Sequence, residues 1–319
     1  MKPPPKPPPQ PETVGGSGQD PDTLFHQGLS LHQQGRLGEA QAIYEKLLDL
    51  HPRHFGAVYS LGVIAAQSGR HLEAVEILDR ALAIDPHHVE ALFNHGNLLH
   101  QLKRPREALE SYQRLIQLKP DFADAHLNRG IVPQQLNRLQ DALASLERFI
   151  QLNPGYGGAH FHRGNVLRLL ERPLDALASY DKATELQPDH AQAYSNRGNV
   201  LKDLDRFEEA LASYDKAIAL APGTAEAHYN RGNVLQELER REEAIAAYER
   251  AIELKPDFVQ AHFTLSQCRL TLGDFARGWQ GYESRWDQRR QSGTTTREFA
   301  APPLAWRGTA HRQDYSAAQ

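Results

Sequence analysis

The stretch AEAHYNRGNVLQELERREEAIAAYERAIELKPDF, residues 225–258, holds the pattern that decides the fold. Its apolar residues follow i, i+3, i+4, i+7 spacing, which predicts two helices. The polar run ERREE at 239–243 separates them, and Pro256 ends the second because proline cannot continue a helix. We therefore interpret the stretch as a helix A, a short turn, a helix B and a turn that contains proline.

This pattern recurs along the chain at a fixed step of 34 residues. The closing proline is found at Pro52, Pro86, Pro120, Pro154, Pro188, Pro222 and Pro256. Glycine recurs in helix A at Gly28, Gly62, Gly96, Gly130, Gly164, Gly198 and Gly232. Helix B carries alanine at Ala40, Ala74, Ala108, Ala142, Ala176, Ala210 and Ala244. Four residues later comes a large side chain: Tyr44, Leu78, Tyr112, Leu146, Tyr180, Tyr214 and Tyr248. A fixed period of this length indicates a stack of repeated helix pairs.

The residue types of the repeat explain how two helices would pack. Glycine inside a helix costs about 1 kcal/mol relative to alanine, so its recurrence needs a packing reason. Glycine and alanine allow two helix axes to approach closely, while tyrosine or leucine fills the space beside them. One pair cannot bury its apolar face alone, so neighbouring pairs stack around a continuous core. The predicted fold class is an all-α solenoid of antiparallel helix pairs.

On these residues the chain resembles the tetratricopeptide repeats. The resemblance covers residues 21–258 as seven full units and residues 259–291 as a degenerate eighth unit or capping helices. It implies a right-handed superhelix in which helix A lines the concave face, and that groove holds a peptide. Residues 1–20 are predicted to be a disordered, proline-rich tail, and residues 292–319 an irregular carboxyl-terminal tail.

Side-chain amides recur on the face of helix A that the resemblance assigns to the groove. Units are counted from Pro21, Phe55, Val89 and so on, and positions 5, 6 and 9 then share one face of helix A. An amide both donates and accepts hydrogen bonds, so a row of amides could pair with the backbone of an extended peptide. The candidate amides at positions 6 and 9 are Asn94, Asn97, Asn128, Asn165, Asn196, Asn199, Asn230 and Asn233. Aromatic rings at position 5 would contact apolar side chains of the peptide, with candidates Phe93, Phe161 and Tyr229. The alternative is that the amides are exposed polar residues and the rings pack between repeats.

The asparagine row is similar to that of the repeat arm of O-linked N-acetylglucosamine transferases and of bacterial repeat proteins related to them. We therefore expect a non-catalytic scaffold that binds extended segments of a protein or peptide partner. The alternative is a substrate-recognition arm, or a truncated fragment, of a glycosyltransferase linked to such repeats. A third possibility is self-association, because the open ends of a solenoid expose apolar surface. A co-chaperone groove that binds a C-terminal carboxylate is excluded, since it needs lysine at position 2, where no unit has a basic residue.

Arginine recurs at position 7 of helix A, and it allows two interpretations. The residues are Arg129, Arg163, Arg197 and Arg231. They could form a strip that attracts an anionic ligand in the groove. Alternatively, each aliphatic stem covers the core while its guanidinium reaches an acidic neighbour.

One proline departs from the pattern. Pro133 lies inside the predicted helix A of the fourth unit, where it removes a backbone hydrogen bond. We therefore expect a kink or hinge at this point of the stack.

The remaining composition excludes several classes of function. The 40 acidic and 36 basic residues give a net charge of −4, which argues against a nucleic-acid binder with a broad basic surface. The one cysteine, Cys268, excludes an internal disulfide and a zinc site of several thiolates. No apolar run approaches the roughly 20 residues that a bilayer crossing needs. The first residues lack the apolar region of a secretory signal, so we expect a cytoplasmic protein.

No cluster of residues has the spacing of a metal site or of a nucleophile with its base. We therefore expect no metal, no cofactor and no catalytic residue in this chain, although related longer proteins would include glycosyltransferases. The repeated histidines, His126, His160, His228 and His262, are expected to lie in the core or between helices.

Overall fold

The computed structural model describes residues 20–132 and 138–281. These residues form paired helices without strands, which confirms the predicted all-α solenoid of antiparallel helix pairs. The first helices of the pairs are α1 (Pro21–Gln33), α3 (Phe55–Gln67), α5 (Val89–Gln101), α7 (Ala123–Ile131), α9 (Gly157–Leu169), α11 (Ala191–Asp203), α13 (Ala225–Glu237) and α15 (Val259–Thr271). The second helices are α2 (Leu37–Leu50), α4 (His71–Ile84), α6 (Pro105–Leu118), α8 (Leu139–Leu152), α10 (Pro173–Leu186), α12 (Phe207–Leu220) and α14 (Arg241–Leu254). Residues 275–281, which follow α15, are helical as well.

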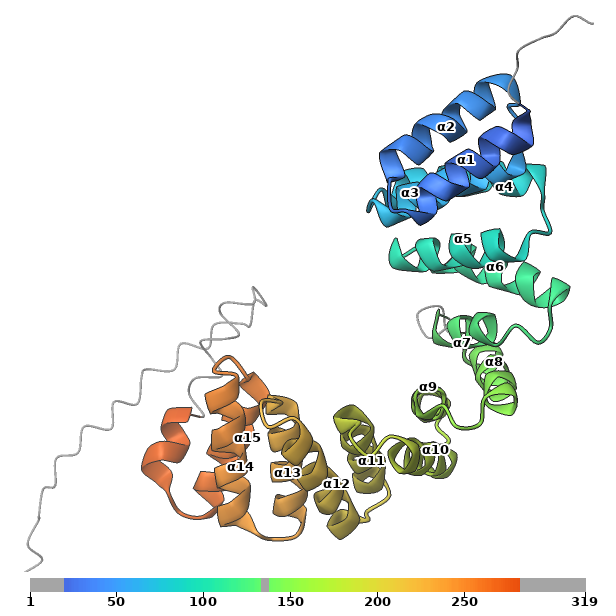
Figure 1. The fold of residues 1–319 in the computed structure, drawn as a ribbon. Coiled ribbons are helices and arrows are strands. Elements are labelled where there is room, and N and C mark those ends of the chain that lie inside the picture. The colour runs from blue at the N-terminus through green and yellow to red at the C-terminus, as the bar shows by residue number, and fades with distance from the viewer. Residues whose placement is uncertain (1–19, 133–137, 282–319) are drawn as a thin grey trace, which may run out of the picture.

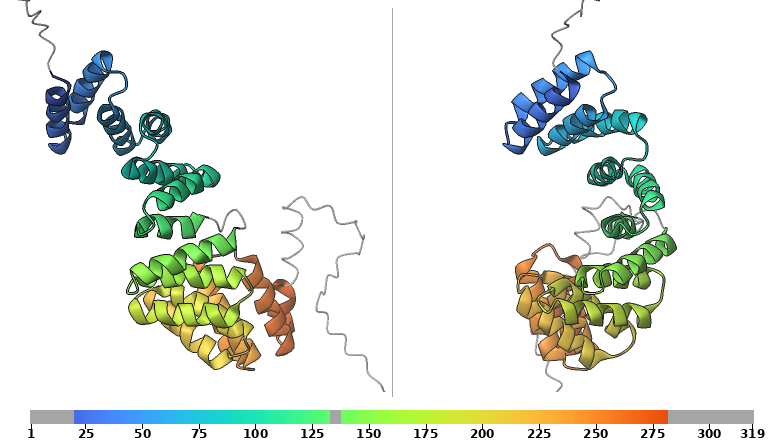
Figure 2. Two further views of the ribbon diagram at one scale, coloured as in Figure 1. Left: turned by 90° about the vertical axis from the view of Figure 1, so that its right-hand side faces the viewer. Right: turned by 45° about the vertical axis from the view of Figure 1, so that its right-hand side comes forward.

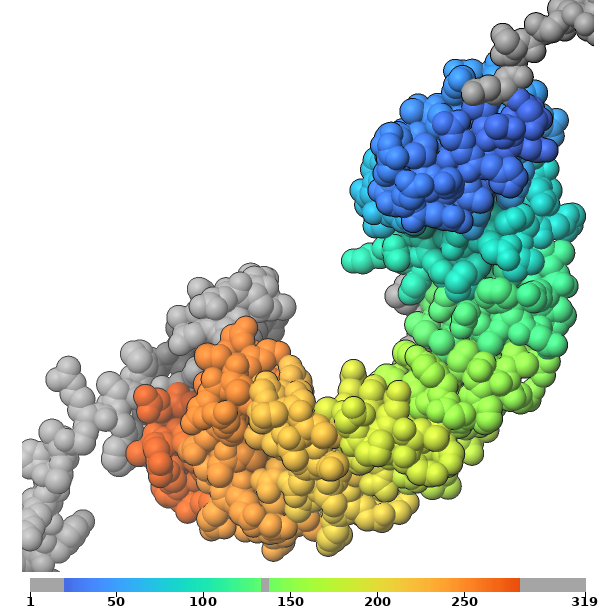
Figure 3. Space-filling view, in the orientation of Figure 1, coloured from blue at the N-terminus to red at the C-terminus, as the bar shows by residue number. Residues whose placement is uncertain are grey.

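The stack curves into an open arc (Figures 1 and 2). The odd-numbered helices lie toward the inside of the arc and the even-numbered ones toward the outside, most plainly for α9 against α10. In agreement with this arrangement, α9 contacts the first helices of both neighbouring units, α7 and α11. The space-filling view shows the hollow that the arc encloses (Figure 3). The odd-numbered helices therefore line the concave face.

The turn from helix A to helix B requires one residue in the left-handed backbone region. Gly35, Gly69 and Gly273 take this conformation with φ of 76°, 75° and 83°. Glycine is favoured there because it has no Cβ that would clash. At the corresponding position of other units, residues with side chains have φ of 57°: Lys103, Glu171, Asp205 and Glu239.

The regularity is interrupted in the fourth unit. Helix α7 has nine residues, whereas α1 and α9 have 13. Two large hydrophobic clusters of the described residues also meet here, one ending at Val132 and the other beginning at Ala142. Pro133 lies outside the described residues, so the kink expected there stays a prediction.

Each helix pair approaches closely at the glycine of helix A. A Cβ added to Gly232 would lie 2.5 Å from the nearest ring carbon of Tyr248, and one added to Gly164 would lie 2.6 Å from Tyr180. Both rings are fully buried. A side chain at the glycine position would therefore overlap the ring, which confirms the packing role predicted for these glycines.

We expect Gly232→Ala to destabilise the protein by about 1–3 kcal/mol, because the added methyl group overlaps the Tyr248 ring in a filled core. The higher helix propensity of alanine opposes this effect by about 1 kcal/mol at most. Urea unfolding followed by circular dichroism measures the change. Gly223→Ala is the matched control, since its Cβ would have no atom within 4 Å. Equal unfolding midpoints for the two variants would contradict the packing role.

Candidate functional site

The asparagines of the concave helices form hydrogen-bonded pairs between neighbouring units. Asn128 at position 6 donates its Nδ2 to Oδ1 of Asn97, at position 9 of the preceding unit, over 2.8 Å. The same bond joins Asn196 to Asn165 (2.8 Å) and Asn230 to Asn199 (3.1 Å). We call these three the asparagine pairs, and each connects adjacent first helices.

The tyrosine that packs on the glycine also holds the position-9 asparagine. The hydroxyls of Tyr112, Tyr180 and Tyr214 donate to Oδ1 of Asn97, Asn165 and Asn199 over 2.7, 2.8 and 2.7 Å, respectively. Burial raises the pKa of all three phenols, so they stay protonated donors. Each position-9 oxygen thus accepts two hydrogen bonds, which fix the orientation of its amide.

Each asparagine pair keeps one donor and one acceptor that these bonds do not use. Within residues 20–132 and 138–281, Nδ2 of Asn97 and Oδ1 of Asn128 have no hydrogen-bond partner. Both side chains are half-buried and therefore reach solvent. The second and third pairs leave the same two atoms. The amides are more constrained than freely exposed polar residues, and each pair keeps one donor and one acceptor for further hydrogen bonds.

The two remaining candidate amides stand outside this arrangement. Asn94 donates to the Tyr59 hydroxyl over 2.9 Å. Asn233 accepts from the Tyr248 hydroxyl over 2.9 Å, and the next unit offers Thr264 at position 6 instead of an asparagine. Both lie on the outermost helices of the paired region, Asn94 on α5 beside Asn97 and Asn233 on α13 beside Asn230.

The candidate aromatic rings pack against the residue at position 34 of their own unit, which immediately precedes the next first helix. Phe93 lies 5.2 Å from Phe122, measured between ring centroids. Phe161 lies 4.7 Å from the ring of His190, and Tyr229 lies 5.0 Å from that of Phe258. Phe161 is only 8% exposed, so its ring belongs to the stack and offers a ligand almost no surface. Phe93 and Tyr229 are half-buried and keep an accessible part.

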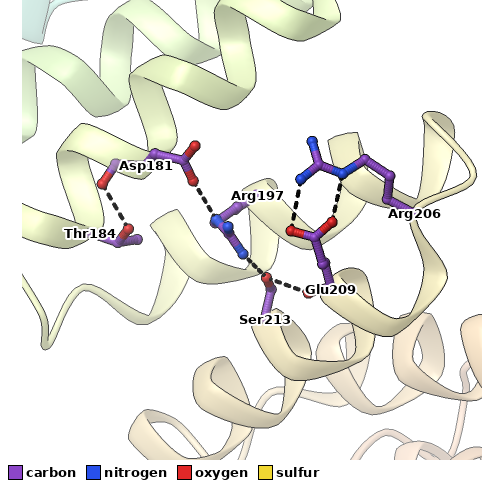
Figure 4. Close-up of polar contacts among 6 residues, drawn as sticks. All are labelled: Asp181, Thr184, Arg197, Arg206, Glu209 and Ser213. Atoms are coloured by element: carbon purple, nitrogen blue, oxygen red, sulfur yellow. Dashed lines mark hydrogen bonds and ion pairs between the residues drawn. The ribbon is translucent and has the colours of Figure 1, made fainter.

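Three of the four position-7 arginines form ion pairs across the unit boundary. Arg197 donates Nε to Asp181 of the preceding second helix over 2.6 Å and Nη1 to Ser213 over 2.6 Å (Figure 4). Arg163 pairs with Glu147 (3.2 Å) and Arg231 with Asp215 (2.6 Å) in the same way. We call this contact, from position 7 to position 25 of the preceding unit, the junction pair.

These pairs agree with the second of the two interpretations for three of the arginines. The side chains of Arg163, Arg197 and Arg231 are 26%, 23% and 25% exposed. The charge of each is matched by a carboxylate of the preceding unit, as the second interpretation expects. Arg129 differs, because position 25 of its preceding unit is Gln113, and no ion pair of Arg129 is found in the described part of the chain.

The repeated histidines lie between units, as expected. Nε2 of His126 is 2.8 Å from the carbonyl oxygen of Pro120, the proline that closes the preceding unit. His160, His228 and His262 contact the corresponding prolines at 3.2, 3.1 and 2.9 Å. These bonds connect each closing turn with the next first helix.

The described residues were also compared with the requirements of a metal site, a reactive thiol and a membrane span. No group of three or more metal-ligating side chains comes together there. Cys268 is buried, and burial raises the pKa of its thiol. In the same part of the chain, every helix falls short of the length and apolarity that a bilayer crossing demands.

Taken together, these features define a repeat solenoid with a polar concave face. Three family models, each described as tetratricopeptide repeat, match residues 25–89 and 229–292, residues 61–127 and 97–172, and residues 156–222 and 189–257. The matches overlap from residue 25 to residue 292, and the chain belongs to the tetratricopeptide repeat family. Proteins with this fold generally mediate protein–protein interactions. All three models describe repeats, with no enzymatic domain among them.

Solved structures of repeat proteins are similar to the chain. YrrB, described as a tetratricopeptide-repeat protein with an unusual peptide-binding site, is 27% identical with a TM-score of 0.52. The match covers 59% of this chain and 96% of YrrB. A repeat protein from Parabacteroides merdae is 18% identical, with a TM-score of 0.54, and covers 79% of this chain and 99% of its own. MamA from Desulfovibrio magneticus is 22% identical, with a TM-score of 0.52. This match covers 54% of this chain and 97% of MamA. The last two show the fold alone. No curated protein matches the chain in sequence.

We expect the protein to lose stability as pH falls below about 6.5, because three of its histidines resist protonation in the folded state. Burial lowers the pKa of His95, His126 and His162 below the ordinary value of 6.5. As pH falls, these histidines therefore bind protons in the unfolded chain before they do so in the folded protein. The free energy of unfolding is highest above pH 6.5 and decreases between pH 6.5 and the lower pKa values of the folded state. Urea midpoints at pH 7.5 and 5.5 measure the loss. His95→Gln should reduce it and His87→Gln, at an exposed turn, should not. An equal loss in both variants would show that His95 is not responsible.

Proposed function

We propose that the concave face binds an extended segment of a partner protein through the asparagine pairs. The observation that carries this proposal is the unused donor and acceptor of each pair, at Nδ2 of position 9 and Oδ1 of position 6. An extended backbone offers the complementary groups, a carbonyl and an N–H, at every residue. Recognition of this kind depends little on the side chains of the ligand.

The spacing of the pairs suits an extended chain. Packed helices stand about 10 Å apart, and an extended chain advances about 3.3 Å per residue. A ligand that runs along the stack would therefore advance about three residues per unit. It would meet asparagine pairs where the third unit joins the fourth, the fifth joins the sixth and the sixth joins the seventh. The tyrosine bonds orient the amides before the ligand arrives, which reduces the entropy lost on binding.

The similarity to YrrB supports the proposal, since that protein is described as having a peptide-binding site. The chain then acts as a non-catalytic scaffold, and its partner is a protein or peptide rather than a nucleic acid. A bacterial origin, a cytoplasmic location and self-association remain proposals from the sequence. The alternative, a recognition arm or truncated fragment of a glycosyltransferase, rests on resemblance in the sequence alone, and the comparisons add no support for it.

Within this proposal, Arg129 is the one candidate anion contact of the position-7 row. The other three arginines of the row are engaged in junction pairs, whereas position 25 of the unit before Arg129 holds the neutral Gln113. An acidic side chain of the ligand would supply the missing carboxylate.

We expect the double variant Asn196→Ala/Asn230→Ala to weaken peptide binding by about tenfold or more, since it removes the position-6 acceptors of two pairs. Peptides selected from a displayed random library provide the ligands, and fluorescence anisotropy measures their affinity. Methylation of backbone nitrogens in the bound peptide should weaken binding more than substitution of its side chains. Asn153→Ala, at an exposed turn after α8, is the control. Unchanged affinity of the double variant, with its fold retained, would refute the role of the pairs.

We expect Arg129→Glu to weaken an acidic peptide more than a neutral one, with little change in stability, because no ion pair is broken. Arg197→Glu should instead destabilise the fold, since it leaves Asp181 facing a second carboxylate. Anisotropy with the two peptides and urea unfolding measure these effects. Equal losses for acidic and neutral peptides in Arg129→Glu would leave this arginine without a role in anion binding.

A further inference from the structure

The junction pair recurs along the stack with the same geometry. A base at position 7 contacts an acid at position 25 of the preceding unit in four junctions, the fourth being His95 with Asp79 at 3.1 Å. In three of them the base also contacts a serine at position 23 of its own unit, as Arg197 contacts Ser213. In these three junctions the base therefore connects two successive second helices.

The first junction has the acid of this contact but not the base. Glu45 occupies position 25, while Leu61 replaces the base and Ile77 replaces the serine. Within the described residues, the hydrogen bond to the Glu45 carboxylate comes from the neutral amide of Gln41, over 2.8 Å, and no cation pairs with it. The place of the missing base is an open cavity of about 420 Å³ between α2 and α4.

The last junction shows what happens when leucine stands at position 7. Leu265 replaces the base there, and Arg269, one helical turn further along α15, donates to Glu249 over 2.5 Å. That arginine side chain is only 18% exposed. The corresponding residue in α3 is Ala65, which cannot reach Glu45. Two junctions of the described chain have leucine at position 7 opposite an acid at position 25. In the last one Arg269 binds that acid, whereas in the first one no arginine does.

The lining of the cavity suits a guanidinium with its aliphatic stem. Leu61 and Ile77 provide an apolar wall, along which methylene groups can pack. The carboxylates of Glu45, Asp49 and Glu76 also line the cavity, and none has an ion pair in the described residues.

Two arginines line the cavity as well, and they leave its charge negative. Arg70 is neutralised by Glu73 at 2.9 Å. Arg80 has no ion pair in the described residues, but three unpaired carboxylates outnumber it.

We propose that this cavity binds an arginine side chain supplied by a partner protein, which completes the first junction as the chain's own arginines complete the later ones. Arginine is selected over lysine because its planar guanidinium can donate to two acceptors at once, and three unpaired carboxylates line this cavity. The cavity lies between even-numbered helices, on the side of the arc away from the asparagine pairs. The proposal is therefore independent of peptide binding on the concave face.

The first test titrates the full chain with acetyl-Gly-Gly-Arg-Gly-Gly-amide and follows the methyl signals of Leu61 and Ile77 by NMR. The same peptide with citrulline or lysine in place of arginine gives the comparison, because citrulline keeps the shape without the charge. We expect the arginine peptide to bind at least tenfold more tightly than the citrulline peptide and more tightly than the lysine peptide. Glu45→Gln should weaken it about tenfold, and Glu208→Gln, an exposed acid of α12, should not. Equal affinities for the three peptides, or an unchanged affinity in Glu45→Gln, would overturn the proposal.

The second test supplies the arginine from within the chain. Leu61→Arg should form the missing junction pair, raise the thermal midpoint by about 2 °C relative to Leu61→Gln, and abolish binding of the arginine peptide. In the Glu45→Gln background the thermal gain should disappear. The same gain in both backgrounds would show that Glu45 does not bind the guanidinium.

Discussion

The whole architecture depends on the contact between a glycine of helix A and the tyrosine or leucine of helix B. At Gly232 a single Cβ would overlap the Tyr248 ring, so the distance between the two helices of that unit is set by the absence of a side chain. Because the contact recurs every 34 residues, each unit presents the same surface to its neighbours. The stack can then repeat without adjustment, and its curvature follows from the shape of one unit.

The same contact also determines the polar surface. The Tyr214 ring fills the space above Gly198, and its hydroxyl donates to Asn199. Asn199 in turn accepts from Asn230 of the next unit. Packing within a unit, orientation of the amide and the connection between units therefore rest on one side chain. A leucine at this position, as in Leu78 and Leu146, packs equally on glycine but cannot orient an amide. Position 9 has no asparagine in those two units, which agrees with this dependence.

The fold could be predicted from the sequence because its period places every helix, and the starts of the first helices follow it without exception. The candidate amides and arginines were also found by position. Their partners were not, since Asn128 bonds to an asparagine 31 residues earlier and Arg197 to an aspartate 16 residues earlier. Those separations become meaningful only when the stacking geometry is known. The residue type gave no signal for the left-handed backbone conformation of Glu171, because glutamate disfavours a positive φ and adopts it here only because the turn requires it.

In a protein this regular, the residues that depart from the period leave contacts that the other units complete. A position that conforms, such as Arg231 with Asp215, satisfies its own charge and leaves nothing for a ligand. At Arg129 the base remains and its acid is replaced, whereas at Glu45 the acid remains and its base is replaced. Each departure leaves one half of a contact that the other junctions complete internally. In our proposal, a partner that supplies the absent acid or base forms the same contact that stabilises the other junctions. The contacts that join the units therefore also define which charged group each incomplete junction would bind.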